Sequence, residues 1–170
     1  MAKTTVQAGM IAGTALALAA CGAAHDHAHE GEAGPDRASE VVGFSDITAA
    51  QEGWGTFYPH FTGETPATRD LLVGVADIRP SYLIHPPHRH AEEEFLMVIE
   101  GEGTWSLNGE EFPAKAGDIL YVAPWEIHGI ENTGGQTLRF VVFKYNPQGV
   151  AVPEDPNPEL GEFGLEEAVE

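Results

Sequence analysis

Residues 88–101 of the chain read HRHAEEEFLMVIEG, a run that places two histidines and three consecutive acids directly before an apolar segment. Side chains two positions apart on a β-strand point to the same face, so His88 and His90 project together, with Cα atoms about 6.6 Å apart. Glu94 has the same parity and begins the apolar strand. Burying a bare carboxylate there is unfavourable, so the pattern predicts a cation or hydrogen-bond donors beside these three side chains.

A second stretch, GDILYVAPWEIHGIEN at residues 117–132, extends the argument. Together the two stretches resemble the paired motifs of the cupin superfamily, in a small single-domain form. The first motif is His-x-His, three residues, Glu, six residues and Gly; the second runs from Gly to His eleven residues later and to Asn four further on. The matching residues are His88, His90, Glu94 and Gly101, then Gly117, His128 and Asn132.

The resemblance implies an all-β fold, the double-stranded β-helix or jelly-roll barrel of cupins. It also implies one divalent metal ion (Fe, Mn, Ni or Zn) held by four ligands: His88, His90, Glu94 and His128. Mixed imidazole and carboxylate ligation suits these ions, and four ligands leave one or two positions open for substrate or oxygen. Some cupins keep the barrel and histidines without binding metal, or use the metal only to hold the fold, and this alternative stays open.

The sequence departs from the family pattern at several positions. The first motif's leading glycine would fall at Tyr82, and the second motif's proline and inner glycine at Ala123 and Trp125, with Pro124 displaced by one. These positions shape turns and the pocket lining. The departures therefore affect the expected substrate more than the expected fold or metal. The resemblance covers roughly residues 65–146 when the strand pattern is followed outward from the motifs.

Several residues near the motifs are candidates for further roles. Tyr82, Trp105 and Trp125 are substrate-pocket candidates, with ordinary core packing as the alternative, and Trp125 is the strongest because it precedes His128 by three positions. Glu126 shares the parity of His128 and is a weak candidate for a catalytic base. His85 has the opposite parity to His88 and is expected at the surface or behind the metal ligands.

Outside the motifs, the middle of the chain consists of strand-length runs rich in Val, Ile, Tyr, Phe and Thr, separated by Gly, Pro and Asn. Such runs predict β-strands joined by turns. Asn108-Gly109 between TWSL and EEF predicts a two-residue hairpin turn. One barrel domain is expected over residues 42–147.

The amino terminus predicts export. Residues 1–20 contain an early lysine, an uncharged apolar run and small residues, typical of a signal peptide. The following LAAC at residues 18–21 resembles the lipobox of bacterial lipoproteins, in which Cys21 would be lipidated. Cys21 is the only cysteine. The alternative is an ordinary secretory signal with an incidental cysteine. The expected location is the bacterial cell envelope, lipid-anchored on the periplasmic side or the outer surface.

The two ends flanking the barrel have no apolar periodicity. Residues 21–41 predict a flexible tether, because they cannot bury enough surface to offset ordering entropy. Its histidines, His25, His27 and His29, are either a weak metal-capturing tract or, preferably, part of a polar spacer. Residues 148–170 predict an acidic, proline-rich, extended tail with at most a short helical turn.

The net charge of −19, from 8 basic and 27 acidic residues, argues against nucleic acid and anionic lipid as partners. Membrane contact is expected only through the lipid anchor. Serine triads and phosphate-binding glycine loops are not recognisable in the sequence. A homodimer through edge strands is expected, since open sheet edges favour association.

Two function hypotheses follow. The first is a metal-dependent cupin enzyme acting on a small organic substrate, as a dioxygenase or another oxidoreductase or isomerase. The second is a non-catalytic lipoprotein that binds a metal or a small ligand. The fold alone does not choose between them.

Overall fold

The computed structural model describes residues 33–163, and these residues form two antiparallel β-sheets. The signal peptide, Cys21 and the tether histidines lie outside the described residues. Within them, helix is limited to two single 3-10 turns, η1 (Phe44–Asp46) and η2 (Pro158–Leu160). No helix in this part of the chain has the length and apolar character needed to cross a bilayer.

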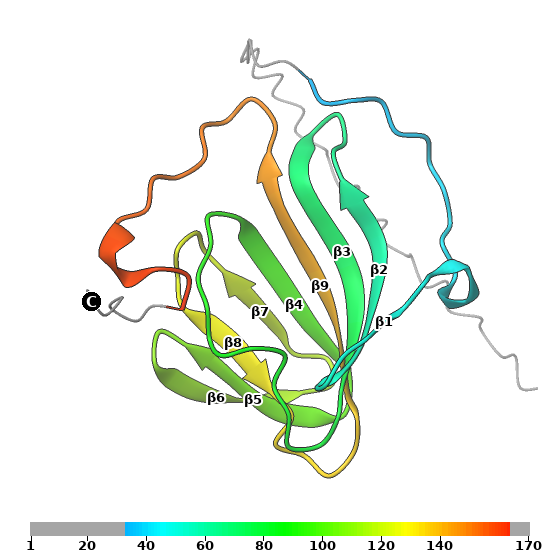
Figure 1. Cartoon of the computed structure of the whole chain (residues 1–170), viewed down its shortest axis with the longest axis vertical. Coiled ribbons are helices and arrows are strands. Elements are labelled where there is room, and N and C mark those ends of the chain that lie inside the picture. Colours follow the sequence, from blue (N-terminus) through cyan, green and yellow to red (C-terminus); the bar gives the residue numbers. More distant parts are fainter. Residues whose placement is uncertain (1–32, 164–170) are drawn as a thin grey trace, which may run out of the picture.

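The larger sheet has six strands in the order β1-β2-β3-β9-β4-β7 (Figure 1). Its strands are β1 (Ala50–Gln51), β2 (Gly55–Gly63), β3 (Thr68–Ile78), β4 (Glu93–Glu100), β7 (Ile119–Val122) and β9 (Leu138–Pro147). All neighbours in the sheet are antiparallel. Strand β9, the last in the chain, lies between β3 and β4, so the sheet joins residues far apart in sequence.

The smaller sheet has the order β6-β5-β8, built from β5 (Glu102–Leu107), β6 (Glu110–Lys115) and β8 (His128–Glu131). Strands β5 and β6 form a hairpin around Asn108 and Gly109, whose φ angles of 51° and 82° are the positive values of a type I′ turn. The hairpin predicted from this dipeptide is therefore confirmed.

The core lies between the two sheets. It takes Leu96 and Val98 from β4, Phe140 and Val142 from β9, and Trp105 from β5. Burying each of these side chains contributes about 1.5–3 kcal/mol to folding. The two packed antiparallel sheets confirm the predicted all-β jelly roll, and Figure 1 shows them open toward one end.

Strand β4 explains how a carboxylate enters this core. Its residues alternate strictly, so the inward face carries Glu94, Leu96 and Val98 and the outward face carries large apolar side chains. The outward series continues on β7 and β9 and is at least one-third exposed at each of these positions: Phe95, Met97, Ile99, Ile119, Tyr121 and Phe143. The register that buries Leu96 thus also buries Glu94.

Residues 79–92 connect β3 to β4 and cross to the smaller sheet. Isolated antiparallel bridges join Leu83 to Glu131 and His88 to His128, so this connection is attached to β8 at two points. The first histidine motif therefore lies on a segment that is not itself a named strand, and β8 holds it in place.

After β9 the chain turns back toward this connection, as the orange-to-red segment of Figure 1 shows. Arg89 contacts it directly: its backbone N–H donates to the carbonyl of Glu162 at 2.8 Å. Residues 153–162 of the predicted tail thus pack against the barrel, and the expected short helical turn corresponds to η2.

Candidate metal centre

Four side chains from three parts of the fold converge inside the barrel. Glu94 comes from β4, His128 begins β8, and His88 and His90 come from the connection between β3 and β4. One ligand atom from each residue lies within 4.8 Å of the ligand atoms of the other three. The structure therefore brings together the whole ligand set that the family resemblance implies.

Glu94 is the centre of the cluster. Its Oε2 lies 2.8 Å from His90 Nε2 and 3.0 Å from His128 Nε2. The side chains of Glu94 and His128 are 8% and 2% exposed, so water does not screen these contacts effectively. Adjacent ligands at right angles on an ion with bonds of about 2.1 Å would stand roughly 3 Å apart, which matches both separations.

The outer nitrogens of two histidines fix their tautomers. His128 Nδ1 donates to the carbonyl of Glu126 at 2.9 Å, and His90 Nδ1 donates to the carbonyl of Glu92 at 3.2 Å. A neutral imidazole has a single N–H, so both Nε2 atoms then direct a lone pair at the Glu94 carboxylate. This arrangement is favourable only if a positive charge lies among the three atoms. A divalent cation fits it, with the backbone carbonyls orienting the ligands.

His88 differs from the other two histidines. Its Nδ1 is buried and has no hydrogen-bond partner among the described residues. Its ring lies 4.5 Å from that of His128 and 5.1 Å from that of His90, measured between centroids. A buried, unpaired nitrogen is unfavourable by about 1–3 kcal/mol, which a coordinated ion would offset in this cluster.

The electrostatics favour ligation at neutral pH. Burial raises the pKa of Glu94, but in the metal-free cluster N–H donation from Nε2 of His128 and His90 outweighs it and lowers the pKa to about 2; a bound cation would take the place of these protons. Burial, together with repulsion from His128 and His85, lowers the pKa of His88 to about 3. Glu94 is therefore ionised and His88 neutral at pH 7, the states in which both bind metals.

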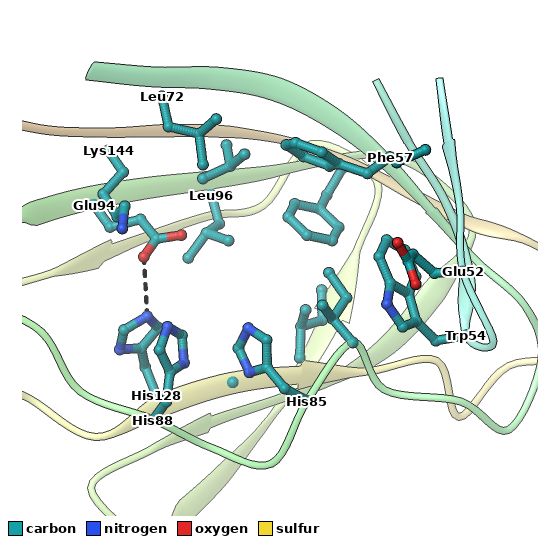
Figure 2. Close-up of a pocket in the computed structure, with 16 residues that line it drawn as sticks. Glu52, Trp54, Phe57, Leu72, His85, His88, Glu94, Leu96, His128 and Lys144 are labelled. Atoms are coloured by element: carbon teal, nitrogen blue, oxygen red, sulfur yellow. Dashed lines mark hydrogen bonds and ion pairs between the residues drawn. The ribbon is translucent and has the colours of Figure 1, made fainter. Parts of the chain in front are cut away.

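Three of the four cluster residues, His88, Glu94 and His128, line one end of a cavity of about 370 Å³ (Figure 2). Most of the wall is apolar, formed by Trp54, Phe57, Leu72, Ile84, Leu96, Ile130, Phe140 and Val142. Figure 2 shows Lys144 beside Glu94, facing His88 and His128 across the cavity, whereas Glu52 and Trp54 lie at the opposite end. The site thus combines a polar end with a long apolar wall.

The aromatic candidates from the sequence lie elsewhere in the described structure. Tyr82 is 46% exposed and stacks under the guanidinium of Arg79, Trp105 is 4% exposed in the core, and the indole of Trp125 donates to the carbonyl of Pro153. None of the three lines the main cavity. They are replaced there by the Trp54 and Phe57 side chains, which come from the segment preceding both motifs.

Two candidates remain, Glu126, whose role differs from the expected one, and His85, which has a further role beyond the expected one. Glu126 contributes its backbone carbonyl to His128, and its side chain is not part of the cavity wall. His85 is exposed, as predicted, but it also lines the cavity, with its ring 4.1 Å from that of His88. An additional imidazole therefore lies beside His88 at the cavity wall.

One charged residue beside the cluster, Lys144, escaped the sequence argument. Lys144 faces inward on β9, and its Nζ lies 3.3 Å from Glu92 Oε1; the other oxygen of Glu92 lies 3.3 Å from His90 Nδ1. Position 144 has the parity of Phe140 and Val142, which are buried. The sequence signal that could have identified Lys144 is a lysine at a core-facing position of a strand.

Comparison with known proteins agrees with the fold and the motifs. Residues 74–144 match the model of the cupin domain family. A dimethylsulfoniopropionate lyase, DddW, from Ruegeria pomeroyi is 32% identical over 100 residues, covering 59% of this chain and 62% of that protein. A gentisate 1,2-dioxygenase from a Streptomyces species is 26% identical over 119 residues, covering 61% of this chain and 33% of that protein.

Among solved structures, a predicted oxalate decarboxylase from Thermotoga maritima superposes with a TM-score of 0.55 at 28% identity, covering 62% of this chain and 98% of that one. The matched region thus spans under two thirds of the lyase and a third of the dioxygenase. Together the family match and the structural neighbours support the cupin superfamily.

Proposed function

We propose that this chain is a metal-dependent cupin enzyme that acts on a small organic substrate carrying a carboxylate. The observation that carries the proposal is that three members of the His88, His90, Glu94 and His128 cluster line one end of a cavity whose wall is mostly apolar; His90 alone does not line it. A site that only stabilised the fold would not need a cavity of about 370 Å³ beside the ligands.

A divalent ion held by these four side chains would supply a Lewis acid at this end of the cavity. The chain's own residues set its surroundings. Glu94 and the neutral His88 present ligand atoms at pH 7, while the carbonyls of Glu92 and Glu126 orient His90 and His128. The apolar wall excludes water and strengthens electrostatic contacts with a bound substrate.

Lys144 supports a carboxylate as the group recognised. It lies opposite Glu94 in the register of β4 and β9, its side chain is 26% exposed, and it is the cation of the cavity wall. A cationic side chain in a protein of net charge −19 selects for anions at this point. Dimethylsulfoniopropionate, gentisate and oxalate, after which the three proteins compared above are named, are all carboxylates.

The apolar wall supports a second property of the substrate. Trp54 and Phe57 line the cavity away from the metal ligands, and Figure 2 shows Trp54 with Glu52 at the end opposite Glu94. A ligand with its carboxylate near Lys144 would lay its remaining carbon skeleton along this wall. We therefore infer a substrate with a compact apolar or aromatic body.

The test starts from purified full-length protein, whose metal content is measured before and after chelation. We expect one divalent ion per chain, lost in His128→Ala. The protein is then screened against carboxylates, including oxalate, gentisate and dimethylsulfoniopropionate, with oxygen uptake and product formation as readouts. Turnover that disappears in His88→Ala supports the enzyme. Metal and carboxylate binding without turnover of any compound would instead support a non-catalytic binding lipoprotein.

We also propose that the protein is exported and anchored through a lipid on Cys21. The support is the LAAC sequence at residues 18–21, preceded by an apolar run. Metabolic labelling with a radioactive fatty acid tests it: we expect label in the wild-type protein and none in Cys21→Ser. Label in neither protein would contradict the anchor.

A further inference from the structure

Arg89 stands between the ligands His88 and His90 in the sequence, yet it points away from them and is only 2% exposed. Arginine is almost never fully buried unless it is paired. What covers this arginine is the segment that follows β9, residues 153–162, which we call the C-terminal strap. Because Arg89 lies between His88 and His90, its ion pair with a distant segment bears on how those two histidines are held in place.

The strap binds Arg89 through three groups. One guanidinium nitrogen, Nη2, pairs with the carboxylate of Asp155, and the other, Nη1, donates to the carbonyl of Asn157 at 3.0 Å. The Arg89 backbone N–H donates to the carbonyl of Glu162 at 2.8 Å. Asp155 Oδ1 also accepts from the backbone N–H of Asn157 at 2.8 Å, so the same carboxylate shapes the strap and holds the arginine.

Trp125 makes a second connection. Its indole N–H donates to the carbonyl of Pro153 at 2.9 Å, its ring lies 5.2 Å from the Arg89 guanidinium carbon, and its backbone N–H donates to the carbonyl of His90 at 2.7 Å. It has a φ of 66°, in the left-handed region. That conformation is unfavourable for a non-glycine residue, and the indole contacts offset it.

These contacts join the strap to both histidine-bearing segments. Arg89 links it to the connection that carries His88 and His90, and Trp125 links it to the segment leading into His128. The connection forms few β-sheet hydrogen bonds, because it is attached to β8 by isolated bridges. Its conformation is therefore sensitive to groups that pack against its outer side.

We propose that the C-terminal strap, acting through Arg89, positions His88 and His90 and thereby sets the metal affinity of the site. This inference rests on the proposed metal site, but it assigns a role to residues that make no contact with the ion. Asp155 and Arg89 are positioning residues. Holding the connection in its ligating conformation before the ion arrives removes an ordering cost from binding. Partners behind ligands typically change metal affinity 10–100-fold.

The test compares two ion-pair variants of the full chain. Asp155→Asn keeps the size of the side chain but removes the charge facing Arg89. Asp77→Asn does the same to the pair between Asp77 and Arg139, whose two hydrogen bonds of 2.5 and 2.6 Å lie on the larger sheet away from the ligands. Each protein is stripped of metal and titrated calorimetrically with Mn²⁺ and with Zn²⁺.

We expect Asp155→Asn to weaken metal binding by about 10–100-fold, and Asp77→Asn to change it by less than about 3-fold even if its melting temperature falls further. A chain ending at Val152 should resemble Asp155→Asn in metal affinity. Equal affinities in the two asparagine variants would overturn the proposal. A loss of stability that is common to both variants cancels in this comparison, so it does not produce a difference in metal affinity between them.

Amide hydrogen exchange of metal-free protein separates this proposal from the metal site itself. We expect the peptide covering residues 86–90 to exchange at least about 10-fold faster in Asp155→Asn than in Asp77→Asn, because the strap protects the Arg89 amide. If wild-type protein bound no ion, the proposed function would fail while this difference would still support positioning by the strap. Equal exchange in the two variants would contradict positioning.

Discussion

His88 and His128, 40 positions apart in the chain, face each other in a single antiparallel bridge, and each backbone N–H donates to the other's carbonyl at 2.9 Å. The bridge brings their imidazoles to a centroid separation of 4.5 Å. The two sequence motifs are therefore joined by main-chain hydrogen bonds between His88 and His128.

Replacing Glu94 by glutamine should remove most of the metal affinity. The variant keeps the shape of the side chain but loses the charge that lies 2.8 and 3.0 Å from two imidazole nitrogens. We expect metal binding to weaken by more than about 100-fold, beyond the range typical of residues behind the ligands. Calorimetric titration with Mn²⁺ measures the change.

The neighbouring Glu93 provides the control for this variant. Its carboxylate accepts a hydrogen bond from Tyr121 on the other side of the sheet, away from the cluster. Glu93→Gln should leave metal affinity unchanged within about 3-fold, well below the effect of a lost ligand. A similar loss in both variants would mean that the overall negative charge of this region, and not direct ligation by Glu94, governs metal binding.

Lys144→Met should weaken carboxylate binding without removing the metal. A charge-assisted hydrogen bond contributes about 1.5–3 kcal/mol, so oxalate affinity of the metal-loaded protein should fall by roughly 10-fold or more. Lys144→Arg should restore much of it, because it returns a cation to the cavity wall. Oxalate titrations of both variants and of the remote, exposed Lys115→Met provide the comparison. Unchanged affinity in Lys144→Met would exclude the lysine as the anchor.

Metal-free protein should lose stability as the pH falls below about 6.5. The pKa of His88 is about 3 in the folded chain against 6.5 for the free group, so the unfolded state takes up its proton first. The pKa of Glu94 is about 2 against 4.5, which adds a second loss of stability as the pH drops through that range. Both shifts have the same sign.

Thermal melts in the presence of a chelator from pH 7.5 to pH 4 check this prediction. The melting temperature should decrease steadily over that interval, and the decrease between pH 6.5 and 5 should be smaller in His88→Gln. A melting temperature that rose toward acid pH would contradict the burial of a neutral imidazole.

Asn132→Ala should destabilise the fold while leaving the metal site of the folded protein intact. The Asn132 side chain is fully buried; its amide donates to the carbonyls of Ile78 and Gln136 and accepts from the N–H of Gly134. Losing these bonds should lower the free energy of unfolding by about 2–4 kcal/mol. Urea unfolding measures it, and metal titration at low temperature should show wild-type affinity.

Much of the fold and of the ligand cluster could be predicted from local signals. The alternation along β4 determined that Glu94 lies on the buried face of the strand. The Asn108-Gly109 pair specified the hairpin between β5 and β6. The four ligands were implied by the resemblance of the two motifs to those of the cupin superfamily. The strand and turn signals lie within a few residues of the features that they predict, where strand periodicity and turn chemistry are strongest.

The parts that the sequence did not predict depend on contacts between distant segments. Asp155 meets Arg89 from 66 positions away, and nothing in the tail's composition distinguishes a docked segment from a free one. Trp125 was expected in the pocket because of its distance from His128, but its positive φ turns it toward the strap. The homodimer, the tether and the lipid anchor stay predictions.

The four ligands differ in how firmly their backbones are held. Glu94 is hydrogen-bonded within a strand paired on both sides, with Val122 of β7 and Lys144 of β9, whereas His88 and His90 belong to a segment held by isolated bridges. Opening of the segment disturbs far fewer backbone bonds than any shift of β4. A bound ion should therefore leave His88 and His90 first and Glu94 last. The rate of metal exchange should follow the rate at which residues 79–92 open locally.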